Sequence, residues 1–390
     1  MMIDTAQGIT RPRGFRAAGV TAGLKKSGKA DLALVVNDGP AHQAAAVFTS
    51  NRFAAAPVIW SRSVMADGLL RGVVLNSGGA NACTGPQGMI DAQAMASQLA
   101  KGLSCPIDQV AVASTGLIGE ALAMDKVIAG IDLAVDQLTA TGGQLAAEAI
   151  MTTDTVSKQA SYVSPSGWSI GGMAKGAGML APALATMLVV LTSDVDLPAE
   201  RLDEALRLAC AESFDRADAD GCMSTNDSVM LLANGASGVR PDDLEFLTAL
   251  KLCCISLARQ LIADAEGAEH AITVCVNHAA SVDDALEVAR CVARSNLFKC
   301  AIAGNDPNWG RVLAAIGTTE ADFDPDQVSV AFNGQTVFAD GRPGVDRHLV
   351  DLTDFAVAVD IDLDAGEQTG TIWTTDLTHG YVSENADYSS

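Results

Sequence analysis

The segment whose residues could carry out the most unusual chemistry covers residues 171–186. It reads Gly171-Gly-Met-Ala-Lys175-Gly-Ala-Gly178-Met-Leu-Ala-Pro182-Ala-Leu-Ala185-Thr186. Its glycines and its lysine suggest a phosphate-binding loop at first sight. Such a loop, however, has Gly-Lys-Ser/Thr after a strand and before a helix. Here the lysine precedes a glycine, and the apolar run 186–192 that follows is typical of a buried strand. The order of the residues therefore argues against nucleotide binding.

Thr186 offers a second chemistry at the same place. The small residues before it would leave the preceding carbonyl accessible, so its hydroxyl could attack that carbonyl in an N→O acyl shift. Hydrolysis would then free an N-terminal threonine, whose α-amine has a reference pKa of about 8 and could act as the base for its own hydroxyl. Threonine is also a common strand residue, so spacing alone leaves a purely structural role open.

Alternating strand-like and helix-like segments must position these groups. In the first half, the pattern predicts helices over 91–102 and 123–138 and strands over 32–36, 45–48, 72–75 and 110–114. The last of these strands enters the turn Thr115-Gly116, and Trp168-Ser-Ile170 leads into the glycine-rich segment. This alternation predicts the α/β (α+β) class.

The second half continues in the same manner. Pro198 opens a helix with Leu202, Leu206 and Cys210 on one face, and a longer helix spans about 242–264. Ser281-x-x-Asp284 resembles a capping box, and Asn333-Gly334 is a strong hairpin signal. Further strands are predicted over 271–276, 328–332, 335–338, 355–361 and 371–375. Because no repeat or linker interrupts the chain, we expect its halves to interlock.

Charge excludes several kinds of partner. The chain has 390 residues and a net charge of −22, of which residues 1–185 carry +1 and residues 186–390 carry −23. An acidic chain repels nucleic-acid phosphates and anionic membrane surfaces, and no lysine or arginine cluster makes a local exception. We therefore expect no nucleic acid and no membrane among the partners. The length suits one large domain or two to three smaller ones.

The cysteines and histidines predict neither disulfides nor a metal site. The nine cysteines are odd in number and show no C-x-x-C pair or zinc-ligand spacing, and the five histidines do not cluster in the sequence. Residues 1–20 lack the apolar core of a signal peptide, and no run of 18 apolar residues occurs. We expect reduced thiols, no metal, no membrane span and a cytoplasmic location.

Eight motifs together resemble one enzyme family. They are Gly14-Phe15-Arg-Ala-Ala-Gly19, Asn76-Ser-Gly-Gly-Ala-Asn81-Ala-Cys-Thr-Gly85, Ser114-Thr-Gly-Leu-Ile-Gly119, Ile150-Met-Thr-Thr-Asp154, the segment 175–186, Ser224-Thr-Asn-Asp227, Asp306-Pro-Asn-Trp-Gly-Arg311 and Asn385-Ala-Asp-Tyr-Ser-Ser390. On these motifs the sequence resembles the ornithine acetyltransferase, or glutamate N-acetyltransferase, family of arginine biosynthesis over nearly its whole length.

The resemblance implies a processed enzyme. It implies self-cleavage between Ala185 and Thr186 into an α chain, 1–185, and a β chain, 186–390, which interlock in one catalytic unit with a smaller C-terminal lobe in the β chain. The two chains would assemble as an α2β2 heterotetramer. The implied fold is an αββα sandwich that resembles the N-terminal-nucleophile enzymes but has the topology of its own family.

The resemblance also implies the roles of individual residues. Thr186 would be the nucleophile, and the Thr115 hydroxyl and Gly116 amide would form the oxyanion hole. The implied substrate contacts are Thr152, Lys175, Thr186, Glu266, Asn385 and Ser390. Each residue also has a purely structural interpretation. Thr115-Gly116 could be a strand exit, and Lys175 could be a strand-end or surface lysine. Glu266 could lie at a solvated helix end, and the polar tail could be a disordered terminus. The resemblance turns that tail into a lid over the substrate.

Two details depart from the family pattern. Glu269-His270 stands where the family commonly has Thr-Lys, and the tail reads Asn-Ala-Asp-Tyr where relatives often have Asn-Ser-Ala-Tyr. Both departures lie near implied substrate contacts and leave those contacts matched. We expect them to affect substrate affinity rather than the reaction.

The implied reaction is a ping-pong acetyl transfer. Thr186 would take the acetyl group of N2-acetylornithine as an ester, and glutamate would remove it as N-acetylglutamate. No cofactor is expected, while acetyl-CoA as a further acetyl donor stays open. Two alternatives also stay open: an N-terminal-threonine amidase or aminopeptidase that uses water as the acceptor, and a non-catalytic binding protein that remains one chain.

Overall fold

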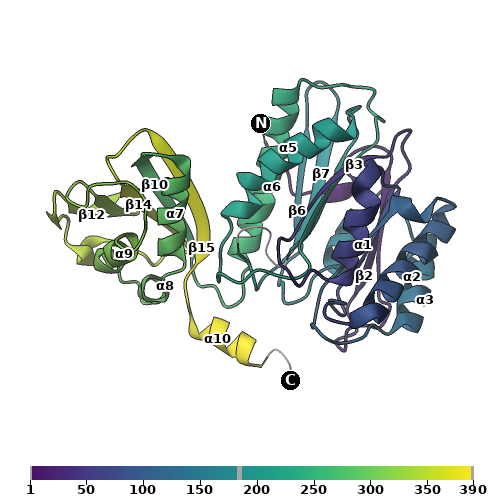
Figure 1. Ribbon diagram of the computed structural model, residues 1–390, viewed down its shortest axis with the longest axis horizontal. Coiled ribbons are helices and arrows are strands. Elements are labelled where there is room, and N and C mark those ends of the chain that lie inside the picture. Colours follow the sequence, from purple (N-terminus) through teal and green to yellow (C-terminus); the bar gives the residue numbers. More distant parts are fainter. Residues whose placement is uncertain (1, 182–186, 388–390) are drawn as a thin grey trace. The chain divides into compact units, whose positions relative to one another are not determined.

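The computed structural model describes residues 2–181 and 187–387, which form two compact units (Figure 1). Unit 1 comprises Met1–Ala177, Ala183–Asp215 and Met223–Leu261. Unit 2 comprises Gly178–Pro182, Arg216–Cys222 and Ile262–Ser390. Each unit therefore draws on sequence from both sides of Thr186.

Unit 1 stacks two sheets on one another. The first has the order β1-β2-β4-β5 and is formed by Phe15–Val20, Leu32–Asn37, Gly72–Asn76 and Val110–Ser114. The second has the order β3-β9-β8-β7-β6 and is formed by Gln43–Phe48, Ser228–Ala233, Leu188–Ser193, Ser169–Lys175 and Lys158–Val163. Apolar side chains of both sheets, among them Val35 and Val73 from the first and Val190 and Leu232 from the second, share one core.

Helices cover the outer faces of the two sheets. α2 (Gly85–Leu103) and α3 (Met124–Asp136) pack against the first sheet through Leu99 and Ile131. α5 (Ala199–Ala211) and α6 (Asp243–Ala263) flank the second sheet (Figure 1). This layering confirms the predicted αββα fold class. Two shorter helices, α1 (Ala56–Val64) and α4 (Gly143–Ala149), complete the unit.

Within the described part of the chain, α6 is the one helix that has the length and composition to cross a membrane. Half of its most apolar window is buried inside the protein. Phe246, Cys253 and Leu257 on this helix are fully buried. Such burial is the behaviour of a core helix, and the interrupting Lys251 and Arg259 explain why no apolar run stands out in the sequence.

The first part of the glycine-rich segment is a strand and not a loop. β7 pairs antiparallel with β8, β8 pairs parallel with β9, and every residue of these three strands is buried. A Cβ on Gly171 would lie 1.9 Å from the Gly8 carbonyl oxygen, and one on Gly172 would lie 2.8 Å from a Leu191 methyl carbon. Close packing therefore requires these two glycines, and phosphate binding does not.

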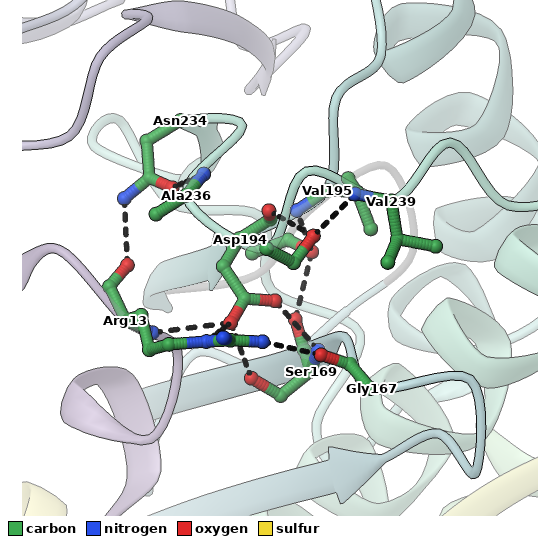
Figure 2. Close-up of polar contacts among 10 residues, drawn as sticks. Arg13, Gly167, Ser169, Asp194, Val195, Asn234, Ala236 and Val239 are labelled. Carbon is green, nitrogen blue, oxygen red and sulfur yellow. Dashed lines mark hydrogen bonds and ion pairs between the residues drawn. The ribbon is translucent and has the colours of Figure 1, made fainter.

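A polar network centred on the buried Asp194 lies at one end of the second sheet (Figure 2). The carboxylate of Asp194, directly after β8, accepts hydrogen bonds from the amides of Arg13 and Ser169 at 3.2 and 2.7 Å and from the Arg13 guanidinium at 3.2 Å. The side chain of Asn234, after β9, donates to the Arg13 carbonyl at 2.8 Å. The strand register places this network at the opposite end of β7 from Lys175.

Unit 2 is built on a six-stranded sheet. Its order is β13-β12-β11-β14-β10-β15, with strands Arg342–Pro343, Gln335–Ala339, Ser329–Phe332, Ala356–Asp362, Ala271–Ala279 and Gln368–Thr375. The helices α7 (Val282–Ala293), α8 (Asn296–Ala303) and α9 (Trp309–Ile316) pack against it through one core. A final helix, α10, spans His379–Ala386.

Two local predictions in unit 2 are confirmed. The Ser281 hydroxyl accepts a hydrogen bond from the Asp284 amide at 3.0 Å and caps α7. Asn333 and Gly334 have φ angles of 46° and 77° and connect β11 to β12, as the hairpin signal requires. α10 corrects the interpretation of the tail as disordered, because residues 379–386 are helical.

Candidate active site

The turn Thr115-Gly116 directly follows β5 and is fixed by backbone hydrogen bonds. The Thr115 carbonyl accepts from the Gly79 amide at 3.0 Å, and the Thr115 amide donates to the Asn76 carbonyl at 2.9 Å. Gly116 has a φ of 132°, and a Cβ there would lie 2.7 Å from the Gly79 nitrogen, so only glycine fits. The Gly116 amide has no hydrogen-bond partner among residues 2–181 and 187–387, which leaves it open to an oxyanion.

Lys175 ends β7 and faces this turn. Its side chain is almost completely buried, and its ammonium donates a hydrogen bond to the Thr115 hydroxyl at 3.2 Å. Because that hydroxyl accepts from Lys175, its own proton can be donated to another acceptor. The interpretation of Lys175 as a strand-end residue is correct, and its interpretation as a surface residue is wrong. Unit 1 thus brings together three of the predicted site residues.

Asp154 organises the loop between α4 and β6. One carboxylate oxygen accepts from the Lys158 ammonium and the Gly176 amide, both at 2.7 Å, and the other accepts from the Thr152 amide at 2.9 Å. Burial opposes ionisation, but the charges of Lys175 and Lys158 and these hydrogen bonds outweigh it and lower the pKa of Asp154 to about 2. Asp154 therefore stays ionised and fixes the backbone of Thr152 and of the residue after Lys175.

Lys25 brings another positive charge to this region. Its ammonium donates to the carbonyls of Ala30 and Met151, both at 2.7 Å. Burial lowers its pKa to about 8, with Asp31 opposing that change and Lys175 reinforcing it. The field of several lysines around one buried part of unit 1 suits an anionic group such as a substrate carboxylate.

The segment Ser224-Thr-Asn-Asp227 connects the turn to the start of β8. The Asn226 side chain donates to the carbonyls of Ser114 at 2.8 Å and Ala80 at 2.7 Å. The Asp227 carboxyl accepts from the amide of Met187, the residue after Thr186, at 3.0 Å. Burial raises the pKa of Asp227 well above its usual value, although the Met187 amide and the charge of Lys175 act in the opposite direction.

Unit 2 brings Glu266 and Asn385 into contact. The Glu266 carboxylate accepts a hydrogen bond from the Asn385 side chain at 2.9 Å, so Glu266 is more than a solvated helix end. Gly267 permits this approach of α10, because a Cβ there would lie 2.1 Å from the Tyr381 nitrogen. The Thr378 hydroxyl caps α10 by accepting from the Tyr381 amide at 3.1 Å, and it donates to the Gly267 carbonyl at 2.5 Å.

The departure at Glu269-His270 has a structural explanation. The amides of both residues donate to one oxygen of the Asp376 carboxylate, each at 3.1 Å. The buried His270 ring contacts the other Asp376 oxygen at 2.7 Å and the Leu352 carbonyl at 3.0 Å. His270 therefore makes polar contacts in the interior of unit 2.

Three predicted site residues, Ala185, Thr186 and Ser390, lie outside the described residues. Three others with clear contacts here, Asp154, Asn226 and Asp227, occur in the sequence motifs but had no predicted role. The signal that could have found them is a polar side chain next to an apolar strand. Over the described ranges, no group of three or more histidine, cysteine or acidic residues is arranged to hold a metal ion.

Comparison with known proteins gives consistent matches in sequence. Residues 16–390 match the sequence profile of the ArgJ family. Two proteins named arginine biosynthesis bifunctional protein ArgJ, from Streptomyces avermitilis and Thermobifida fusca, are each 58% identical over 382 residues, which is 98% of this chain and the full length of each relative.

Among solved structures, the chain is similar to ornithine acetyltransferase complexed with ornithine from Mycobacterium tuberculosis. That match has 52% identity and a TM-score of 0.46, and it covers 48% of this chain and 99% of the solved one. A β-aminopeptidase from a Burkholderia species matches with 13% identity and a TM-score of 0.45, over 68% of this chain and 89% of the other.

Proposed function

The chain belongs to the ArgJ family, and we propose that it transfers the acetyl group of N2-acetylornithine to glutamate through an acetyl ester on Thr186. Membership makes it an acyltransferase of arginine biosynthesis. The observation that carries the finer proposal is the buried contact between Lys175 and Thr115. It lies where β7 pairs with β8, because Lys175 is the register partner of Leu188, two residues after Thr186.

Self-cleavage comes first in this proposal. The Thr186 hydroxyl oxygen attacks the carbonyl carbon of Ala185, the C–N bond breaks, and water hydrolyses the resulting ester. The products are an α chain, 1–185, and a β chain, 186–390. The antiparallel pairing of β7 with β8 supports this step, since ladder hydrogen bonds would keep the two chains together after the cut.

Acetyl transfer follows at the new N-terminus. The freed α-amine takes the proton of the Thr186 hydroxyl while the oxygen attacks the acetyl carbonyl. The oxyanion accepts hydrogen bonds from the Thr115 hydroxyl and the Gly116 amide, and Lys175 holds the Thr115 hydroxyl in its donating orientation. Ornithine leaves with the proton, and the amine of glutamate then attacks the ester to give N-acetylglutamate.

Each unit carries proposed substrate contacts of its own. Thr152 and Lys175 in unit 1 hold a carboxylate, in keeping with the lysines gathered there. Glu266 and Asn385 in unit 2, with Ser390, recognise the ornithine moiety, whose ammonium suits the Glu266 carboxylate. The proposal includes an α2β2 assembly and a cytoplasmic location. The relatives are named bifunctional proteins, and the proposal leaves acetyl-CoA open as a second acetyl donor.

Product analysis tests the proposal. Purified protein is incubated with N2-acetylornithine and glutamate, and the products are separated and quantified by mass spectrometry. The proposal expects N-acetylglutamate and ornithine in equal amounts. Free acetate with no N-acetylglutamate would instead identify a hydrolase. A parallel reaction with acetyl-CoA and glutamate shows whether the second donor is used.

A further inference from the structure

Three of the four outer strand edges in the two sheets of unit 1 are covered by other parts of the unit. The backbone of Asp4 exchanges hydrogen bonds with β6 at 2.9 and 2.6 Å. The backbone of Thr139 does the same with β1, at 3.0 and 3.1 Å. The Ser61 hydroxyl of α1 bonds to a backbone amide and a carbonyl of β5 at 2.8 and 2.6 Å. Such contacts prevent an edge strand from pairing with another chain.

The fourth edge strand, β3, is open over most of its length. Its inner side pairs with β9, and on its outer side the Ala44 amide donates to the Gly68 carbonyl at 2.7 Å. Because backbone groups alternate between the two sides of a strand, the amides and carbonyls of Ala46 and Phe48 also face outward. Neither residue has a backbone partner on that side within residues 2–181 and 187–387. Residues 43–48 also contain no lysine, proline or bulge to protect the edge.

A groove of about 600 Å³ runs along this open edge. Residues Ala44–Phe48 of β3 line it, and three of them are alanines with small side chains. One wall is formed by α1 and the short 3-10 helix η2 (Met65–Asp67), and the other wall is formed by α5. A groove with an unpaired strand edge along it has the shape that a strand added from another chain requires.

The wall formed by α1 and η2 carries opposite charges at its two ends. Arg62 lies at the Phe48 end, where its guanidinium donates to the Thr49 carbonyl at 3.1 Å and lies 5.7 Å from the centre of the Phe48 ring. Asp67 lies at the opposite end, directly before Gly68, the residue that binds the first half of β3. This wall is therefore basic at one end and acidic at the other.

The wall formed by α5 has the same polarity. Glu200 lies at the start of β3, because the amide of the preceding residue, Ala199, donates to the Gln43 side chain at 3.1 Å. The helix then follows β3 along the groove, so Arg207, roughly 10 Å further on, lies toward the other end. Asp203 stands between them and pairs with Arg207 at 2.8 Å.

An edge with this polarity is complementary to itself across a two-fold axis. Antiparallel pairing centred on Ala46 places that residue opposite its own copy and Phe48 opposite Ala44. The amide and carbonyl of Ala46 then bond to those of the second copy. The Ala44 amide is engaged within its own chain, but its carbonyl is open to the Phe48 amide of the other. The two five-stranded sheets become one continuous sheet.

We propose that β3 forms the contact between two copies of this chain. The two-fold axis is perpendicular to the sheet, so each wall meets the same wall of the second copy. Arg62 of each copy then faces Asp67 of the other, and Arg207 faces Glu200, so opposite charges meet on both sides of the joined strands. The inference locates the contact between copies in the proposed α2β2 assembly, and it rests on that part of the proposed function alone.

Charge reversal tests the two-fold symmetry directly. Arg62→Glu and Asp67→Arg each place like charges across the axis, and each should weaken the pairing at least about 10-fold. Mixed together, the two variants should pair, because both Arg62–Asp67 contacts in a mixed pair again join opposite charges. Native mass spectrometry of the purified full-length proteins counts the copies. Arg259→Glu makes the same charge change at an exposed position of α6, beside the covered β6 edge, and is the matched control.

The expected result is two copies for wild type and Arg259→Glu, one copy for each groove variant, and a one-to-one pair in the mixture. Pairing of Arg62→Glu within about threefold of wild type, or a mixture that does not pair, would overturn the inference and leave the proposed function intact.

A backbone variant guards against misfolding. If a charge variant does not fold by circular dichroism, Ala46→Pro decides, because proline removes an amide that faces away from β9. Two copies of Ala46→Pro would overturn the inference. A wild type of one copy would overturn the inference and the α2β2 part of the proposed function, while product analysis tests acetyl transfer separately.

Discussion

Lys175 donates a hydrogen bond to the Thr115 hydroxyl at 3.2 Å and so joins the end of β7 in one sheet to the turn after β5 in the other. The two residues are 60 positions apart, and both are buried. Inside the protein, where little water competes, a charged donor orients a hydroxyl strongly. The contact makes Thr115 a directed donor, which is the property that an oxyanion hole requires.

Loss of either partner should slow the chemistry more than it weakens binding. Thr115→Val keeps the shape of the side chain and removes the hydroxyl, and we expect kcat to fall by about 10²–10³-fold with little change in KM. Lys175→Met should reduce kcat and also raise KM, because Lys175 is proposed to contact a carboxylate. Steady-state kinetics with N2-acetylornithine and glutamate measure both changes. A Thr115→Val enzyme with wild-type kcat would remove this residue from the oxyanion hole.

Asp154 should be needed for stability as well as for geometry. Asp154→Asn removes the negative charge that faces the buried Lys158, and breaking such a pair costs about 3–5 kcal/mol. Because the folded pKa of Asp154 is lowered to about 2, its contribution is present above its unfolded value of 3.8 and is lost as pH falls toward 2. Urea unfolding at several pH values measures the effect.

A double variant provides the control for Asp154. In Asp154→Asn with Lys158→Met, no buried charge is left facing a neutral partner, so part of the lost stability should return. If Asp154→Asn alone were as stable as wild type at pH 7, the ion pair would have no structural importance.

The tail contact should affect substrate binding selectively. Asn385→Ala removes the hydrogen bond to Glu266, and we expect the KM for N2-acetylornithine to rise about 10-fold while kcat changes little, because uniform binding is lost. Ser383→Ala, at an exposed position of the same helix, is the matched control and should behave like wild type. Equal kinetics for both variants would argue against a role of α10 in binding.

The lowered pKa of Lys299 in unit 2 predicts how the stability of the fold changes with pH. Its ammonium donates to the Ala219 carbonyl and to the Thr374 hydroxyl, and burial lowers its pKa from 10.5 to about 8 against the pull of three aspartates. Between those values the unfolded chain holds the proton that the folded chain has lost. Stability therefore rises with pH in this window.

The comparison of wild type with Lys299→Met isolates this effect. The free energy of unfolding of wild type minus that of the variant should increase from pH 8 to pH 10.5, by about 3 kcal/mol at most. Other titrating groups, including Lys25, are present in both proteins and cancel. A difference that stays constant with pH would show that Lys299 keeps its ordinary pKa.

Elements with a clear pattern could be predicted from the sequence. The strand predicted over 110–114 is β5, and the helix predicted over 123–138 contains α3. β6 was missed because it begins with the polar pair Lys158-Gln159, and the burial of this pair depends on partners outside the strand, Asp154 for Lys158 and the distant Gln260 for Gln159. α10 was missed because its stability comes from the cap by Thr378 and from contacts of Gly267 rather than from an apolar face.

The site shows the same limit. Thr115, Gly116 and Lys175 were expected only through the resemblance, since a strand exit and a strand-end lysine carry no local sign of a shared hydrogen bond. No local sequence pattern indicated the contact that Asp227 makes. Its contact with Met187 arises from the parallel pairing of β8 with β9, which aligns Leu188 with Ser228. Long-range register of this kind is set by the whole sheet and cannot be read from a segment.

The central claim is that Thr186 is freed by cleavage and then carries the acetyl group. The most direct test is the intact mass of the purified protein after incubation with N2-acetylornithine alone and an acid quench. The account predicts two chains cut between Ala185 and Thr186, with one acetyl group on the chain that begins at Thr186, and loss of that group when glutamate is added. An uncut chain, or a cut chain that forms product without ever carrying the acetyl group, would contradict it.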